Sequence, residues 1–138
     1  MKIRRRHKII FLLSTLSIAA ILVYKIVNEG VKDTIKIKTE ETFTTNELLQ
    51  EFQNEQKNLE AFIEKAIEIE GEIEEITFKA GKYSLILKGN SDKTYILCEM
   101  QTDQNTEVLK LQAGQEVKLK GILKGFLMDI ILLHCVIV

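Results

Sequence analysis

The sequence predicts a mainly β domain, a barrel of five short strands preceded by one α-helix, behind a single N-terminal transmembrane helix. Three observations predict this class. A basic cluster runs directly into a long uncharged segment, apolar residues in the middle of the chain recur at helical spacing, and five later segments alternate apolar and polar residues. Alternation with a period of two is typical of strands with one buried face, whereas apolar spacing of three to four residues is typical of helices.

The N-terminal segment has the charge distribution of a membrane anchor. The basic run Arg4-Arg5-Arg6-His7-Lys8 precedes sixteen uncharged residues, Ile9–Tyr24. A transmembrane helix over residues 9–27 would span roughly 28 Å, close to the hydrocarbon thickness of a bilayer. A cleaved signal peptide is the alternative, but its best small-residue site, Ser17-Ile18-Ala19, lies inside the apolar run. We therefore predict a basic cytoplasmic head, residues 1–8, and a single-pass anchor in the inner (cytoplasmic) membrane, with the C-terminal domain periplasmic or extracellular.

The charge of the chain divides at the same place. Residues 1–30 hold six basic residues against one acidic residue, a net charge of +5. Residues 31–138 hold thirteen lysines, no arginine and nineteen acidic residues, a net charge of −6. Because phosphate backbones are bound mainly through Lys and Arg, this balance argues against nucleic acid as a partner and leaves only a local lysine patch open.

A polar stretch and a helix are predicted next. Residues 28–42 are expected to be a tether, with a short strand around residues 35–37 as the alternative. Thr44-Thr45-Asn46-Glu47 fits a capping box, in which each end residue accepts a hydrogen bond from the backbone N–H of the other. Apolar residues at helical spacing then predict a helix from about Thr45 to Phe62, with its apolar stripe facing the core.

Five strands with alternating patterns are predicted after the helix. Their inward residues are expected to be Ile67, Ile69 and Ile73, then Leu85 and Leu87, then Ile96, Cys98 and Met100, then Val117, Leu119 and Leu123, followed by the almost wholly apolar Asp129–Val138. Turns are predicted at Ala80-Gly81, Gly89–Asp92 and Ala113–Gln115. Gly71 is expected to mark a bulge or bend, and Gly125 to break the fourth strand.

Five short strands with a helical link near Val108 and Leu109, between the third and fourth, are the layout of an OB-fold barrel. With its preceding helix, this domain would cover residues 43–138. In that topology the third strand pairs with the fifth, and the first with the fourth. The second pairing would set a row of glutamates, Glu68, Glu70 and Glu72, near Lys118 and Lys120, where opposite charges help to fix the strand register. A solvated face is the preferred interpretation of this row, and a cation or partner site is the alternative.

The expected ligand surface is the outer face of the second and third strands with the nearby loops. The candidate residues are Phe78, Tyr83, Ile86, Lys88, Tyr95 and Leu97. Proteins that bind single-stranded nucleic acid place several aromatic side chains on a basic groove, which this set matches poorly. Ile86 and Leu97, if exposed together, suit a protein partner better, or they pack under the N-terminal helix of the domain.

Few residues suggest other chemistry. Cys98 and Cys135 are both predicted to point inward from neighbouring strands, so they would form either a disulfide or two buried free thiols, and we weigh these evenly. His134 is expected to be structural. Because the sequence contains no metal-ligand spacing, catalytic triad or glycine-rich phosphate loop, we expect no metal site, no cofactor and no enzymatic activity.

Several motifs occur in a characteristic order along the second part of the chain. They are Thr44–Glu47, Lys65–Gly71, Tyr95–Cys98, Gly114–Gly121 and Leu133–Cys135. Together they make Thr44–Val138 resemble the tRNA_anti-like OB-fold family, whose members are typically bacterial envelope proteins. The resemblance implies an OB-fold domain and supplies no catalytic residues. The family name implies a likeness to the anticodon-binding OB-fold and does not establish tRNA binding.

These inferences together predict a membrane-anchored, non-enzymatic OB-fold binding module exposed outside the cytoplasm. Its ligand would be a protein partner or a small component of the envelope, and nucleic acid is not expected. The alternative is an oligonucleotide- or oligosaccharide-binding protein that uses the outer face of the second and third strands.

Overall fold

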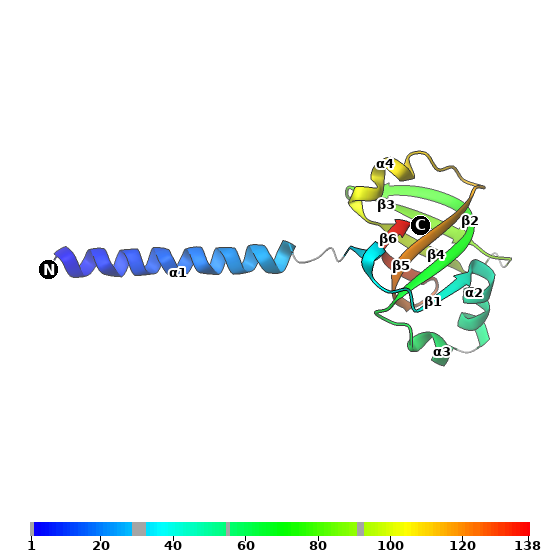
Figure 1. The fold of residues 1–138 in the computed structure, drawn as a ribbon, viewed down its shortest axis with the longest axis horizontal. Coiled ribbons are helices and arrows are strands. Elements are labelled where there is room, and N and C mark those ends of the chain that lie inside the picture. Colours follow the sequence, from blue (N-terminus) through cyan, green and yellow to red (C-terminus); the bar gives the residue numbers. More distant parts are fainter. Residues whose placement is uncertain (1, 29–32, 55, 91–92) are drawn as a thin grey trace. The chain divides into compact units, whose positions relative to one another are not determined.

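The computed structural model describes residues 2–28, 33–54, 56–90 and 93–138. The chain divides into two compact units between Lys32 and Asp33 (Figure 1). The first unit contains helix α1, Lys2–Asn28, within which the predicted anchor lies. Within the residues that the structure describes, no helix is long and apolar enough to cross a membrane.

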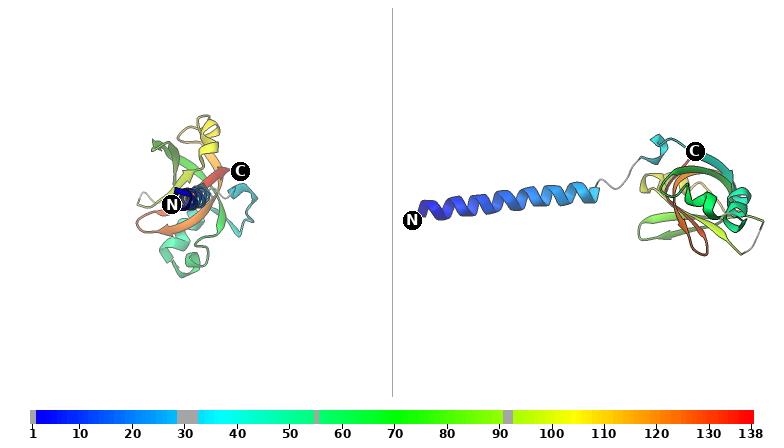
Figure 2. Two further views of the ribbon diagram at one scale, coloured as in Figure 1. Left: turned by 90° about the vertical axis from the view of Figure 1, so that its left-hand side faces the viewer. Right: turned by 90° about the horizontal axis from the view of Figure 1, so that it is seen from below.

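The second unit is a closed β-barrel with one additional edge strand (Figures 1 and 2). Its strands are β1 Glu41–Thr44, β2 Ala66–Lys79, β3 Lys82–Lys88, β4 Tyr95–Met100, β5 Glu116–Phe126 and β6 Ile130–Ile137. The sheet runs β1-β2-β3-β4-β6-β5, and β5 pairs with β2 to close a barrel of five strands. The antiparallel β2–β5 pairing and the parallel β4–β6 pairing confirm the predicted OB-fold topology.

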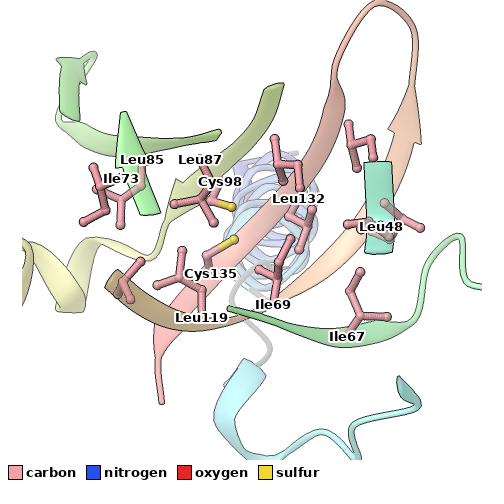
Figure 3. Packing of buried hydrophobic residues seen from close by; sticks show 14 of the residues in the cluster. Leu48, Ile67, Ile69, Ile73, Leu85, Leu87, Cys98, Leu119, Leu132 and Cys135 are labelled. Atoms are coloured by element: carbon pink, nitrogen blue, oxygen red, sulfur yellow. The ribbon is translucent and has the colours of Figure 1, made fainter. Parts of the chain in front are cut away.

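The barrel interior is filled by the residues that the alternation predicts to point inward (Figure 3). The side chains with no exposed surface include Ile67, Ile69, Ile73, Leu85, Leu87, Ile96, Cys98, Leu119 and Leu123, and Met100 and Val117 are also buried. Since successive side chains of a strand point to opposite faces, the same alternation fixes which residues form the outer surface.

The start of the domain's helix is confirmed in detail. The Thr44 N–H donates to Glu47 Oε2 across 2.7 Å, and the Glu47 N–H donates to Thr44 Oγ1 across 3.2 Å. The single predicted helix is observed as two helices, α2 Thr45–Asn54 and α3 Gln56–Glu60, with residue 55 outside the described residues. The helix ends before Phe62, whose ring packs edge-to-face against Phe43 of β1 with 5.7 Å between centroids.

The link between β4 and β5 is helical, as predicted. It comprises the 3-10 turn η2, Thr102–Gln104, and the short helix α4, Asn105–Val108. Val108 is buried in the core, whereas Leu109 is 70% exposed.

Most of the stretch predicted as a tether belongs to the folded domain. Thr34–Lys36 forms a 3-10 turn, η1, and Thr34 is fully buried, its hydroxyl accepting from Gln101 Nε2 across 2.9 Å. The Glu40 N–H then donates to the carbonyl of Ala66, and β1 adds to β2 in parallel. Hydrogen bonds, rather than a continuous apolar face, hold residues 33–40 against the barrel. The sequence of this segment therefore shows no apolar periodicity. Residues 29–32 of the predicted tether lie outside the described residues.

Lys120 differs from its predicted solvated position. Its side chain points away from the barrel interior, as expected, but it is only 6% exposed because residues 33–40 cover it. The Lys120 Nζ donates to the carbonyls of Ile35 and Ile37. The predicted charge register is confirmed for two of the three glutamates: Glu68 lies opposite Lys120 and Glu70 opposite Lys118, and Lys118 Nζ is 3.1 Å from Glu68 Oε2. Glu72 lies opposite Glu116 instead.

The structure refines the roles predicted for two glycines. Gly71 lies next to the point at which β2 passes from its pairing with β5 to its pairing with β3, since Glu72 belongs to both registers. At Gly71, an added Cβ would lie 2.2 Å from Thr45 Cγ2, so the glycine allows the start of α2 to contact β2. The register irregularity of β2 falls instead between Ile73 and Glu75. Gly125 does not end the fourth barrel strand, because β5 continues to Phe126 with a register shift beside the glycine.

Candidate binding surface

Three apolar side chains form a row across the outer face of β3, β4 and β6. Ile86 lies opposite Leu97 in the β3–β4 register, and Leu97 lies beside Ile131 in the β4–β6 register. All three are half-buried. We call Ile86, Leu97 and Ile131 the apolar row. Sequence reasoning identified Ile86 and Leu97 but missed Ile131, although its position between inward-facing Ile130 and Leu132 was a usable signal.

The apolar row is not covered by the domain's helix. The main contacts of α2 are with α3, β1 and β2, and its buried residues Leu48, Leu49 and Phe52 join the core cluster. Packing under this helix, the alternative explanation of an outward Ile86 and Leu97, is therefore not observed.

The lysines that flank the apolar row are paired with carboxylates. Lys88 Nζ lies 3.2 Å from Glu72 Oε1 and 3.0 Å from Glu74 Oε2. Hydrogen bonding to Glu74, and then to Glu72, raises the pKa of Lys88 above its usual value. Lys82 Nζ lies 2.7 Å from Glu99 Oε1. The face therefore presents apolar side chains between internally neutralised charges.

Tyr95 completes this face at the start of β4. It lies opposite Lys88 in the β3–β4 register, and its side chain is half-buried. Its backbone N–H donates to Asp129 Oδ1 across 2.9 Å, which ties the start of β4 to the turn before β6. The structure thus brings together four of the predicted site residues, Ile86, Lys88, Tyr95 and Leu97.

The other two predicted residues, Phe78 and Tyr83, lie beside the first loop of the barrel, as expected, but not on the outer face. They face each other across the β2–β3 hairpin, with 4.6 Å between their ring centroids. Tyr83 shares the inward parity of Leu85 and packs against the core, whereas Phe78 is 60% exposed at the end of β2. Side-chain alternation separates this pair from the outer face, because Tyr83 is an odd number of residues from Ile86.

Both cysteines lie inside the barrel. Cys98 and Cys135 have no exposed surface, both thiols are free, and their sulfur atoms face each other (Figure 3). Burial, and then hydrogen bonding to Cys98, raises the pKa of the Cys135 thiol well above its usual value. Such thiols are poorly reactive while the barrel is closed.

A polar hollow of about 300 Å³ at the start of α2 is lined by residues including Thr45, Glu70, Lys88 and Glu116. Across the described ranges 2–28, 33–54, 56–90 and 93–138, no cluster of three or more His, Cys, Asp or Glu residues is arranged to hold a metal ion.

A closed five-stranded barrel with this strand order and a helical link before the fourth strand defines the OB-fold class. The chain belongs to the tRNA_anti-like family, whose profile matches residues 1–137. The match therefore extends beyond the Thr44–Val138 stretch of the motifs and includes the N-terminal segment. No curated protein matches the sequence.

Two solved structures are similar to this chain at low sequence identity. One is described as a "putative nucleic acid-binding lipoprotein" from Klebsiella pneumoniae, with 18% identity and a TM-score of 0.59 over 69% of this chain and 90% of that one. The Stn1–Ten1 complex of S. pombe contains a chain with 18% identity and a TM-score of 0.44, over 53% of this chain and 57% of that one. At such identities the first likeness shows the fold alone.

Proposed function

We propose that the protein is a membrane-anchored, non-enzymatic OB-fold binding module whose domain lies outside the cytoplasm. Its outer face of β3, β4 and β6 binds a protein or a small component of the envelope. The observation that carries this proposal is the apolar row, set between lysines that are already paired with carboxylates.

The chemistry of this face favours a protein partner. The apolar row is half-buried, so a partner that covers it removes further apolar surface from water. Each Å² removed contributes about 25 cal/mol to the binding free energy. Binding a phosphate backbone would require Lys82 and Lys88 to exchange Glu99, Glu72 and Glu74 for phosphates. The net charge of −6 over residues 31–138 opposes the approach of a polyanion as well.

The membrane anchor and the orientation rest on the sequence. Residues 9–27 carry the apolar run, and the preceding arginines are retained on the cytoplasmic side by the positive-inside rule. A reporter that is active only outside the cytoplasm, fused after Val138, should be active. A silent reporter in cells that produce the full fusion would contradict the orientation.

Oligonucleotide binding is the second candidate function, with an oligosaccharide as the related possibility. The cross-strand neighbours Tyr95 and Lys88 favour oligonucleotide binding. In proteins that bind single strands, the bases stack on aromatic side chains and nearby cations contact the phosphates. The description of the Klebsiella lipoprotein as nucleic acid-binding points the same way.

A titration with labelled single-stranded DNA and RNA separates the two functions. The full chain in detergent micelles should show no saturable binding at low salt. In the variant E72Q/E74Q, which frees Lys88, binding should still be absent. The matched control E107Q frees Lys110, whose Nζ lies 2.9 Å from Glu107 Oε1 in an exposed pair at the link between β4 and β5. Tight, salt-sensitive binding that E72Q/E74Q strengthens and E107Q does not would overturn the proposal in favour of an oligonucleotide ligand.

A further inference from the structure

Cys98 and Cys135 lie on strands that are direct neighbours in the barrel wall. In the parallel β4–β6 pairing, Cys98 lies beside Leu132 and Met100 lies beside Cys135. From Cys98 to Met100 the chain advances two residues, whereas from Leu132 to Cys135 it advances three. The extra residue is a bulge in β6.

This bulge brings the second sulfur into the barrel. His134 adopts a left-handed backbone conformation with φ of 55°. With strict alternation after inward-facing Leu132, His134 would point inward and Cys135 outward. The bulge reverses this order, so that His134 is half-exposed and Cys135 is fully buried, with its sulfur facing Cys98 (Figure 3).

The neighbouring strand is shaped to accept Cys135 in this position. Gly121 of β5 lies against it, and a Cβ at Gly121 would come within 2.5 Å of the Cys135 Sγ. The absence of a side chain at residue 121 therefore provides the space that the sulfur occupies. The two thiols are held together by three features: a shared strand pairing, a bulge and a glycine.

We propose that Cys98 and Cys135 form a reversible disulfide inside the barrel, which links β4 covalently to β6. The external location that favours oxidation of the pair rests on the proposed function, because disulfides persist outside the cytoplasm. The pairing itself rests only on the geometry of the two strands.

The oxidant is a disulfide, either a small-molecule disulfide or the disulfide of an oxidoreductase. The thiolate of one cysteine attacks a sulfur of the oxidant and displaces a thiolate, which leaves a mixed disulfide on the protein. The second cysteine thiolate attacks the protein sulfur of that mixed disulfide and displaces the other thiolate. The pair loses two electrons and two protons, and the oxidant gains them as two thiols.

Burial makes this reaction depend on opening of the barrel. Both sulfurs are shielded from solvent, so exchange requires β6 to separate from β4 or must precede closure of the barrel during folding. We therefore expect slow oxidation of the folded protein and rapid oxidation during refolding. Once formed, the link restrains the unfolded chain between residues 98 and 135 and raises the melting temperature, by on the order of 10 °C.

The test uses the purified full chain in micelles, refolded in a buffer of reduced and oxidised glutathione. The sample is denatured, alkylated and weighed by mass spectrometry, and parallel samples are melted with and without reductant. We expect a species two hydrogen atoms lighter, resistant to alkylation until it is reduced, and a higher melting temperature in the oxidised sample. Recovery of two alkylated thiols across the oxidising range, in a sample with a cooperative melt, would overturn the proposal.

Single variants provide the matched controls. C98A and C135A each retain one thiol, so they should give a glutathione adduct or an alkylated thiol and never the lighter species. Lighter species in either variant would also contradict the pairing. Because the buffer sets the redox conditions, this result is independent of where the domain lies, and an inactive topology reporter would refute the location without affecting the disulfide.

Discussion

The side-chain nitrogen of Lys120 donates to the backbone carbonyl of Ile35 across 3.3 Å, from the outer surface of β5 to the turn that begins the domain. A second carbonyl, that of Ile37, accepts from the same nitrogen, and Glu68 lies opposite Lys120 in the strand register. A buried cation is stable only where its donors are satisfied. These contacts therefore require residues 33–40 to be in place and define where the folded domain begins.

Replacing Lys120 should release this segment. K120M keeps most of the apolar stem but leaves two carbonyls without their donor, so we expect a loss of about 1–3 kcal/mol in the free energy of unfolding. Urea denaturation of the full chain in micelles measures it, and hydrogen exchange should show reduced protection at Ile37. K110M, which changes an exposed lysine paired with Glu107, should cost less than about 0.5 kcal/mol. Equal losses of unfolding free energy for the two variants would show that the hydrogen bonds from Lys120 to Ile35 and Ile37 do not stabilise the domain.

Gly71 should not tolerate a side chain. Because an added Cβ would lie 2.2 Å from Thr45 Cγ2, we expect G71A to cost about 1–3 kcal/mol through displacement of the start of α2. T45A removes the closest atom, so the double variant should be more stable than the two single losses predict, with a coupling of at least about 0.5 kcal/mol. Additive losses in this double-mutant cycle would show that G71A does not destabilise the domain through the contact with Thr45.

The capping box should contribute measurably to α2. T44A removes the hydroxyl that accepts from the Glu47 N–H, with an expected cost of about 1 kcal/mol, and T44S should restore most of it. Thermal unfolding of the two variants in parallel checks this. If the alanine and serine variants melt alike, the hydroxyl does not act as the cap.

Glu68 should make stability depend on pH on the acid side. A hydrogen bond from Thr39, and then one from Lys118, lowers the pKa of the Glu68 carboxyl below its usual value. Since the folded pKa is the lower one, this stabilisation is complete above the unfolded pKa, about 4.3, and is lost as the pH falls through the folded pKa. E68Q should therefore flatten the acid limb of the unfolding free energy below about pH 5.

The matched control for this pH effect is E60Q, which changes an exposed carboxylate at the end of α3. It should leave the acid limb unchanged. If E68Q and E60Q show the same pH profile as the unchanged chain, the Thr39 and Lys118 contacts do not contribute to acid stability.

The barrel could be predicted from the sequence because the patterns that specify its strands and helix lie within short segments of the chain. Alternation in Ile67–Ile73 and in Tyr95–Met100 specifies which side chains enter the core, and Thr44 and Glu47 specify where the helix begins. The docking of residues 33–40 could not be predicted in this way. It depends on Lys120 and Gln101, which are far away in sequence and reach that segment through side-chain hydrogen bonds.

The candidate site was predictable only in part, for a related reason. Ile86 and Leu97 were identified from strand parity, but the pairing of Lys88 with Glu72 and Glu74 depends on the β2–β3 register. That register contains an irregularity between Ile73 and Glu75, which alternation alone cannot reveal. The inward position predicted for Cys135 is confirmed, but it depends on the bulge at His134, which alternation alone does not reveal either.

The central claim is that the apolar row is the surface that engages a partner. Cross-linking from a photoreactive amino acid at position 97 of the full chain, in its native membrane, tests it most directly. The matched control places the same amino acid at position 109, where Leu109 is 70% exposed on the link between β4 and β5. We predict one light-dependent adduct of defined mass from position 97, its loss in the I86E background, and none from position 109. No adduct from position 97, or equal adducts from both positions, would contradict the account.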